Sequence, residues 1–210
     1  MLPQIELFCI GFAAVVDTVL LLIVLERINR PLTAIWLKWA LAGATLWHVG
    51  AFLHTLLRDT VGATAMAVDA VCMTTMVTGM LLLNCSILHA GLRIHHTGGE
   101  PRPRRDLRYI FVYTPVLLII PIAIGIVQSG TRDFIESTRP FHLPFLVWLS
   151  AANLTAAWLF IKNRSRLEQV ARGASSFLVK FSVGLITVTG LVSVYILVAQ
   201  KTRFEPPFRL

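Results

Sequence analysis

Charged residues are scarce in this 210-residue chain, in which Asp, Glu, Lys and Arg together make up 14% of the sequence. A soluble domain carries about 25% charged and about 45–50% apolar residues. Here 56% of the residues are hydrophobic. A globule of this length must still expose a large polar surface, so it cannot enclose that many apolar side chains. The composition therefore excludes a soluble domain and indicates a protein of the lipid bilayer.

The usual signatures of catalysis and metal binding are also missing. The three cysteines, Cys9, Cys72 and Cys85, lie in apolar stretches without a CxxC spacing, which favours small buried hydrophobic residues over zinc ligands. No Ser/His/Asp triad, paired carboxylates, HExxH or glycine-rich phosphate loop occurs. We therefore expect neither enzymatic activity nor a cofactor. The N-terminus has no basic segment before its first apolar run, so we expect a retained helix rather than a signal peptide.

What the chain does have is a series of long apolar runs, each close to the 20 or so residues that cross a bilayer as a helix. Backbone polar groups in lipid must be paired within the segment, which predicts helices. The fold class we expect is all-α, a polytopic membrane bundle with residues 1–210 in one transmembrane domain. The six runs are 5–25, 34–57, 61–92, 109–127, 141–161 and 177–199.

The distribution of positive charge predicts the orientation of these helices. Lys and Arg are concentrated in the loops after the first, third and fifth runs: Arg27, Arg30, Arg93, Arg102, Arg104, Arg105, Arg108, Lys162, Arg164, Arg166 and Arg172. The loops after the second and fourth runs contain only Arg58, Arg132 and Arg139. Cytoplasmic loops are enriched in Lys and Arg, so we expect an outside N-terminus. Six spans then leave the C-terminus outside, and we expect the tail to lead into a seventh helix.

This layout resembles the N-terminal seven-helix region of bacterial sensor histidine kinases. Short local motifs add to the resemblance. They are Leu46-Trp47-His48-Val49-Gly50, Arg139-Pro140-Phe141, and Lys180 with Gly184 and Gly190. The resemblance implies the sensor part of a two-component system in a bacterial inner membrane. The chain departs from the pattern in lacking a phosphoacceptor domain, an ATPase domain and the seventh span.

Ionisable residues within spans are costly and are the first candidates for function. His48 lies nine residues before the end of the second run, and Asp69 lies eight residues after the start of the third. The short connection at 58–60 makes these helices neighbours, so we expect the two side chains to face each other as a switch, a proton relay, a ligand anchor or a structural pair. Asp17 and Asn153 lie near the midplane, where they either bond neighbouring helices or line a ligand pocket.

The remaining histidines are weaker candidates. His54 and His142 lie near the outer interface, where they could form a metal site with His48, although no spacing demands a metal. His48 and His89 lie at different depths and cannot share a haem. We expect His95 and His96, beside the basic loop, to be solvated.

The function that these patterns favour is a membrane-embedded sensor that registers a ligand or a membrane state and signals to a cytoplasmic output domain. The alternatives are a small transporter or channel subunit and a haem-bearing membrane anchor. The expected partners are the lipid bilayer, a small-molecule ligand and a second copy of the chain. The net charge of +8 is assigned to loops at the anionic inner leaflet rather than to nucleic acid.

Overall fold

The described part of the protein is helical throughout. The computed structural model describes residues 2–27, 34–57, 63–97, 107–117, 119, 123–124 and 134–165, and short pieces at 179–180, 183–184, 186–187, 190–191 and 194. No strand occurs among these residues, which confirms the all-α class within them. The elements are α1 (Leu2–Arg27), α2 (Ala34–Leu57), α3 (Ala63–Thr97), η1 (Leu107–Tyr113) and α6 (Phe134–Lys162).

Four of these helices are long and apolar enough to cross a membrane. Their candidate spans are Leu7–Glu26, Lys38–Leu57, Ala67–His96 and Leu143–Lys162. They correspond to the first, second, third and fifth apolar runs. The fourth run begins with the 3₁₀ helix η1, and the structure describes its residues 109–117, 119 and 123–124, whereas most of the sixth run falls outside the described residues. Six spans and an outside N-terminus remain predictions.

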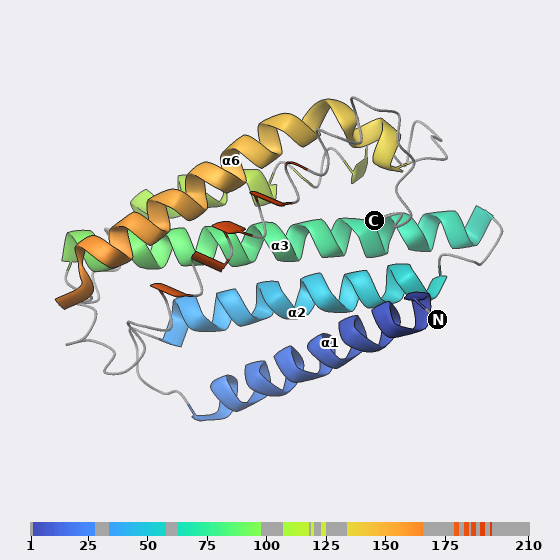
Figure 1. The fold of residues 1–210 in the computed structure, drawn as a ribbon, viewed down its shortest axis with the longest axis horizontal. Helices are drawn as coiled ribbons and strands as arrows, with labels where there is room; N and C mark the ends of the chain where they lie inside the picture. Colours follow the sequence, from blue (N-terminus) through green and yellow to red (C-terminus); the bar gives the residue numbers. More distant parts are fainter. Residues whose placement is uncertain are drawn as a thin grey trace.

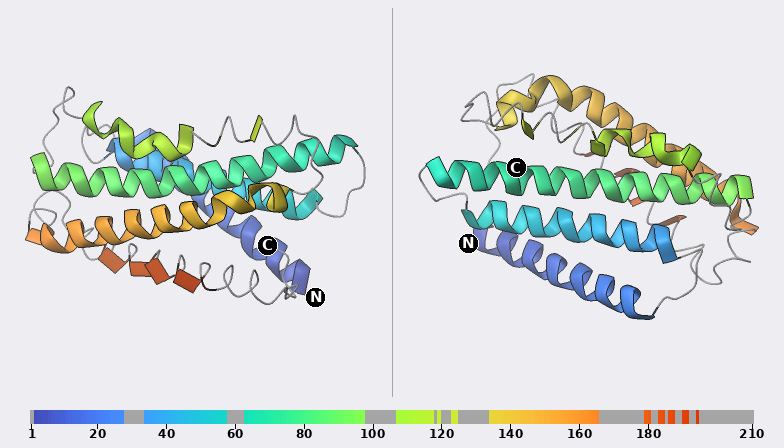
Figure 2. Two further views of the ribbon diagram at one scale, coloured as in Figure 1. Left: turned by 90° about the horizontal axis from the view of Figure 1, so that it is seen from above. Right: turned by 180° about the vertical axis from the view of Figure 1, so that it is seen from behind.

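The helices are arranged around α3, as Figure 1 shows. α2 lies between α1 and α3, while α6 and η1 pack against α3 from its other sides. The two further views in Figure 2 show α6 and η1 as separate neighbours of α3. α3 is the longest element, with 35 residues, and continues to Thr97, beyond the end expected near residue 92. α3 therefore packs against each of α2, η1 and α6.

The contact between α2 and α3 is made through backbone atoms at three glycines. A Cβ atom placed on Gly43 would lie 2.6 Å from the Leu83 nitrogen, and one placed on Gly50 would lie 2.6 Å from the Met76 nitrogen. On α3, a Cβ atom at Gly79 would collide with the backbone at Trp47. Small residues allow this close approach of membrane helices. The glycines therefore set both the distance and the register of the α2–α3 pair.

The buried core lies at the junction of α2, α3 and α6. It contains Ala40, Leu83, Ile87, Ala90, Ile94, Ala156 and Phe160. By contrast, only 6% of the α1 span is buried inside the protein, and its apolar side chains point outward, Phe8 being 73% and Phe12 64% exposed. In a bilayer such a surface faces lipid or another helix, so its exposure requires no further explanation. α1 is thus the least enclosed of the four candidate spans.

Candidate functional site: two histidine–aspartate pairs

The first pair joins α1 to α2 in the middle of both helices. His48 Nδ1 donates a hydrogen bond of 2.6 Å to Oδ2 of Asp17. The two residues lie at the centres of the spans Leu7–Glu26 and Lys38–Leu57. The His48 side chain is 28% exposed and the Asp17 side chain 18% exposed. The His48 ring stacks on that of Trp47 with 5.0 Å between ring centroids. Two ionisable groups thus meet where the bilayer is most apolar.

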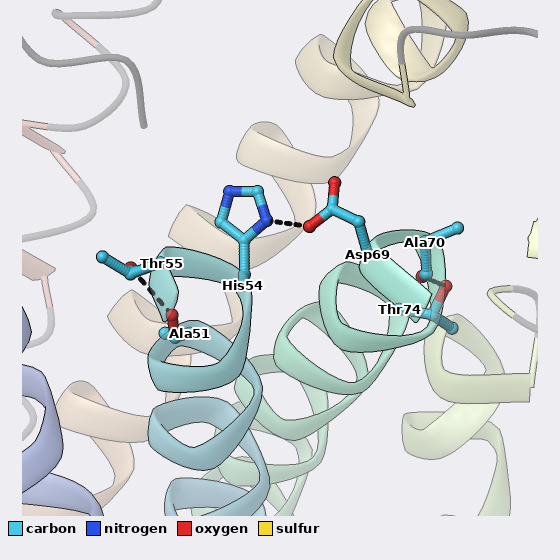
Figure 3. Close-up of polar contacts among 6 residues, drawn as sticks. All are labelled: Ala51, His54, Thr55, Asp69, Ala70 and Thr74. Atoms are coloured by element: carbon cyan, nitrogen blue, oxygen red, sulfur yellow. Dashed lines mark hydrogen bonds and ion pairs between the residues drawn. The ribbon is translucent and has the colours of Figure 1, made fainter. Parts of the chain in front are cut away.

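The second pair joins α2 to α3 near the end where these helices connect. His54 Nδ1 donates a hydrogen bond to Oδ1 of Asp69, as Figure 3 shows. Nearby hydroxyl groups bond within their own helices, Thr55 to the Ala51 carbonyl at 2.9 Å and Thr74 to the Ala70 carbonyl at 2.7 Å. The two threonine hydroxyl groups therefore donate to backbone carbonyls of their own helices, and these bonds involve neither His54 nor Asp69.

The expected pairing of His48 with Asp69 is wrong. Gly50 lies against the backbone of Cys72 and Met76, so His48 is level with residues near Met76, about two helical turns from Asp69. His54, six residues later on α2, reaches the level of Asp69 instead. Six residues also turn the helix by about 240°, so His48 points towards α1 and His54 towards α3.

The proton content of such a pair sets its charge. With imidazolium and carboxylate the pair is neutral as a whole. Removing one proton leaves a carboxylate beside a neutral ring, and adding one leaves an imidazolium beside a carboxylic acid. An uncompensated charge is expensive in an apolar environment, so an ionised side chain within a span needs a partner of opposite charge. Each pair is therefore a polar link between two helices.

The other candidate residues are not part of these pairs. Asn153 is almost fully buried, with 1% exposure, on α6 one turn before Ala156 of the buried core. The side chain of His142 lies outside the described residues. Among the described residues, no group of three or more His, Cys, Asp and Glu side chains could hold a metal ion. His54, the other weak metal candidate, is bonded to Asp69.

Sequence analysis missed a further polar contact on α3. His89 Nδ1 lies 3.0 Å from the Tyr113 hydroxyl group, and the His89 ring lies 5.1 Å from that of Tyr109. The nearby Cys85 thiol donates to the Val112 carbonyl at 3.1 Å. The tyrosines precede Pro115 at the start of the fourth apolar run, and their position next to a histidine-bearing helix was the available signal. This contact fixes η1 on α3.

Comparison with protein-family models, with curated proteins and with solved structures finds no match to this chain.

Proposed function

We propose that this chain is the membrane-embedded sensor module of a signalling protein, which registers a ligand or a change in the membrane and passes it to a cytoplasmic output domain. The observation that carries the proposal is the pair of cross-helix links, Asp17–His48 and Asp69–His54. Ionisable groups within a span are retained at a cost and mark functional positions. Both links include α2, so a change in either alters how α2 meets its neighbours.

The two links connect α2 to different helices, so a change in each is expected to affect a different part of the bundle. α2 and α3 touch through the backbone at Gly43, Gly50 and Gly79, which makes them a stiff unit. At Gly11, α1 meets a side chain of α2, Phe52, and the α1 span is the least buried. A change at Asp17–His48 therefore shifts α1 relative to the α2–α3 unit, while Asp69–His54 holds the end of that unit closed.

The stimulus that the geometry favours is one that changes the charge of the central pair. A stimulus that removes the charge of either partner abolishes the attraction between imidazolium and carboxylate, and α1 is then held less tightly. An anionic or cationic ligand that competes for either partner has the same effect. The response is a shift between two packings of α1.

The proposed orientation places the N-terminus outside and the loops after α1, α3 and α6 in the cytoplasm, in a bacterial inner membrane. A reporter enzyme fused after residue 27, 57, 97 or 162 tests this orientation. Cytoplasmic activity is expected after residues 27, 97 and 162, and external activity after residue 57. The reverse pattern contradicts the orientation on which the output domain depends.

A transporter is distinguished from a sensor by flux. Proteoliposomes that contain the purified protein and a trapped pH-sensitive dye measure proton movement directly. The sensor proposal predicts no flux above that of empty vesicles across pH 5 to 8. Flux that is lost in Asp69→Asn would instead assign the ionisable residues to a transport path.

A further inference from the structure

A hydroxyl group that the Asp17–His48 link does not use lies on the same face of α2. Thr45 precedes His48 by three residues, so the two side chains are neighbours on the helix, with about 5–6 Å between their Cβ atoms. The Thr45 Oγ1 atom is buried, and no group of the described residues hydrogen-bonds to it. Thr18 and Thr55, by contrast, donate to the carbonyl four residues earlier. Thr45 therefore retains an unused donor beside the central pair.

The depth of this hydroxyl group restricts what can bind it. Asp17 lies ten residues after the start of the span Leu7–Glu26, which is about 15 Å along the helix. At this depth no water is at hand to bond a buried hydroxyl group, so leaving it without a partner is costly. Sugars and inorganic ions do not dissolve in hydrocarbon, and an ionic ligand would bring a further charge. The position therefore favours an uncharged ligand that is dissolved in the bilayer.

Such a ligand has direct access to the seam between α1 and α2. α1 lies at the outer side of α2 (Figure 1), only 6% of its span is buried, and both side chains of the central pair are partly exposed. Leu20, one turn after Asp17, is 43% exposed, and Leu46, next to Thr45, is 37% exposed. Apolar surface on both helices therefore flanks the polar groups.

The hydrogen-bonding groups on the two sides of the seam select a hydroxyl group. The Thr45 hydroxyl group donates to an acceptor on the ligand. The Asp17 carboxylate accepts from His48 through Oδ2, and a carboxylate has further acceptor sites that take a donor. One ligand hydroxyl group meets both requirements, since it accepts one hydrogen bond and donates another. An ether or a ketone oxygen only accepts, and a hydrocarbon does neither.

We propose that the seam between α1 and α2 binds an uncharged, membrane-dissolved alcohol. Its hydroxyl group accepts from Thr45 and donates to Asp17, and its apolar part lies beside Leu20 and Leu46. This inference rests on the proposed function, since it names the class of ligand that the sensor registers. Because Thr45 Oγ1 is buried, the alcohol reaches it only when α1 moves away from α2. The alcohol therefore binds the displaced position of α1 and stabilises it.

Photolabelling of the protein in phosphatidylcholine nanodiscs tests the inference. The probe is a long-chain alcohol with a photoreactive diazirine in its chain, and mass spectrometry locates the labelled peptides. We expect labelling within 13–24 and 41–49, with displacement by 1-dodecanol but not by dodecane, which lacks the hydroxyl group. Thr45→Val removes the threonine hydroxyl group and keeps the side-chain shape. It should raise the 1-dodecanol concentration needed for displacement about fivefold, the contribution of one hydrogen bond.

α2 contains a matched control for this substitution. Thr55 lies seven residues after His48, on the same face of the helix, and its hydroxyl group donates to the Ala51 carbonyl at 2.9 Å. Thr55→Val should therefore leave displacement by 1-dodecanol unchanged. Thr45→Ser, which keeps a hydroxyl group at the site, should retain the affinity that Thr45→Val loses.

Three results would overturn the inference. Equal displacement by dodecane would show an apolar groove without a polar site. Unchanged displacement in Thr45→Val, or equal losses in Thr45→Val and Thr55→Val, would show that the Thr45 hydroxyl group does not bind the ligand. Stronger displacement by dodecanoate than by 1-dodecanol would assign the seam to an anion. The proposed function fails by a different result: binding as expected, with no change in the distance between α1 and α3, would keep the site and refute the sensor.

Discussion

At the scale of single residues, the account depends on which histidine meets which aspartate. His48 bonds Asp17 at 2.6 Å, and His54 bonds Asp69. Each link is made by one side chain of α2 and one of a different neighbour. This arrangement predicts that energetic coupling is strong within each pair and absent across pairs.

A double-mutant cycle measures this coupling. Asp17→Asn and His48→Gln, singly and together, should show about 1 kcal/mol of interaction in the free energy of unfolding. This value is near the middle of the range for polar contacts between membrane helices. Unfolding is followed by circular dichroism in mixed micelles.

The chain contains its own controls for this cycle. Asp69→Asn with His54→Gln should show coupling of similar size. Asp17→Asn with His54→Gln, and Asp69→Asn with His48→Gln, should be additive, since neither combination is in contact. Coupling between Asp69 and His48 would restore the pairing expected from the sequence and refute the register described above.

The sequence identified ionisable residues inside apolar runs but not which of them pair. Ionisable residues inside apolar runs stand out by cost alone, so Asp17, His48 and Asp69 are found without a structure. Their pairing depends on the axial register of α2 against α3. That register follows from where Gly43, Gly50 and Gly79 let the backbones touch, and the length of the connecting turn does not reveal it.

At the scale of elements, α2 and α3 approach each other closely enough for their backbones to touch at glycines. A Cβ atom at Gly43 would lie 2.6 Å from the Leu83 nitrogen and 2.8 Å from the Gly79 carbonyl oxygen. Both neighbours are backbone atoms and cannot move aside by changing rotamer. The helices must therefore separate if a side chain is added.

Gly43→Ala should accordingly destabilise the protein by about 1–3 kcal/mol, the usual cost of overpacking. Gly184→Ala is the matched control, because a Cβ atom at Gly184 meets nothing within 4 Å. The midpoint of unfolding in a denaturing detergent measures both variants. A Gly43→Ala protein as stable as the Gly184→Ala protein would show that the backbones are not in contact.

The helices themselves were largely predictable, because a run of about 20 apolar residues has few other structures in lipid. The structure at the start of the fourth run was not predictable. Residues 107–113 form a 3₁₀ helix that ends two residues before Pro115, which provides no backbone N–H donor and restricts the residue before it. Its attachment to α3 by the His89–Tyr113 contact also needed the tertiary structure.

At the scale of the whole molecule, composition alone identifies the lipid bilayer as the environment of the helices. The 14% content of charged residues and four candidate spans agree on a membrane protein. The layout of the elements adds what composition does not contain: an α2–α3 unit in backbone contact, α6 and η1 on one side of it, and α1 with little of its span buried on the other (Figures 1 and 2). This asymmetry is the basis for assigning the moving part to α1.

The central claim is that the charge of the Asp17–His48 pair controls the position of α1 against the α2–α3 unit. Pulsed electron paramagnetic resonance in lipid nanodiscs measures this position. One spin label is placed on the exposed Cys9 of α1 and another on Val71→Cys of α3, which is 63% exposed. The adjacent Cys72 is replaced by alanine, and Cys85, which is fully buried, is left in place.

We predict that the distribution of label distances is longer and broader in the Asp17→Asn protein than in the protein with Asp17, because the carboxylate that holds His48 to α1 is then missing. Equal distributions in the two proteins would contradict the claim.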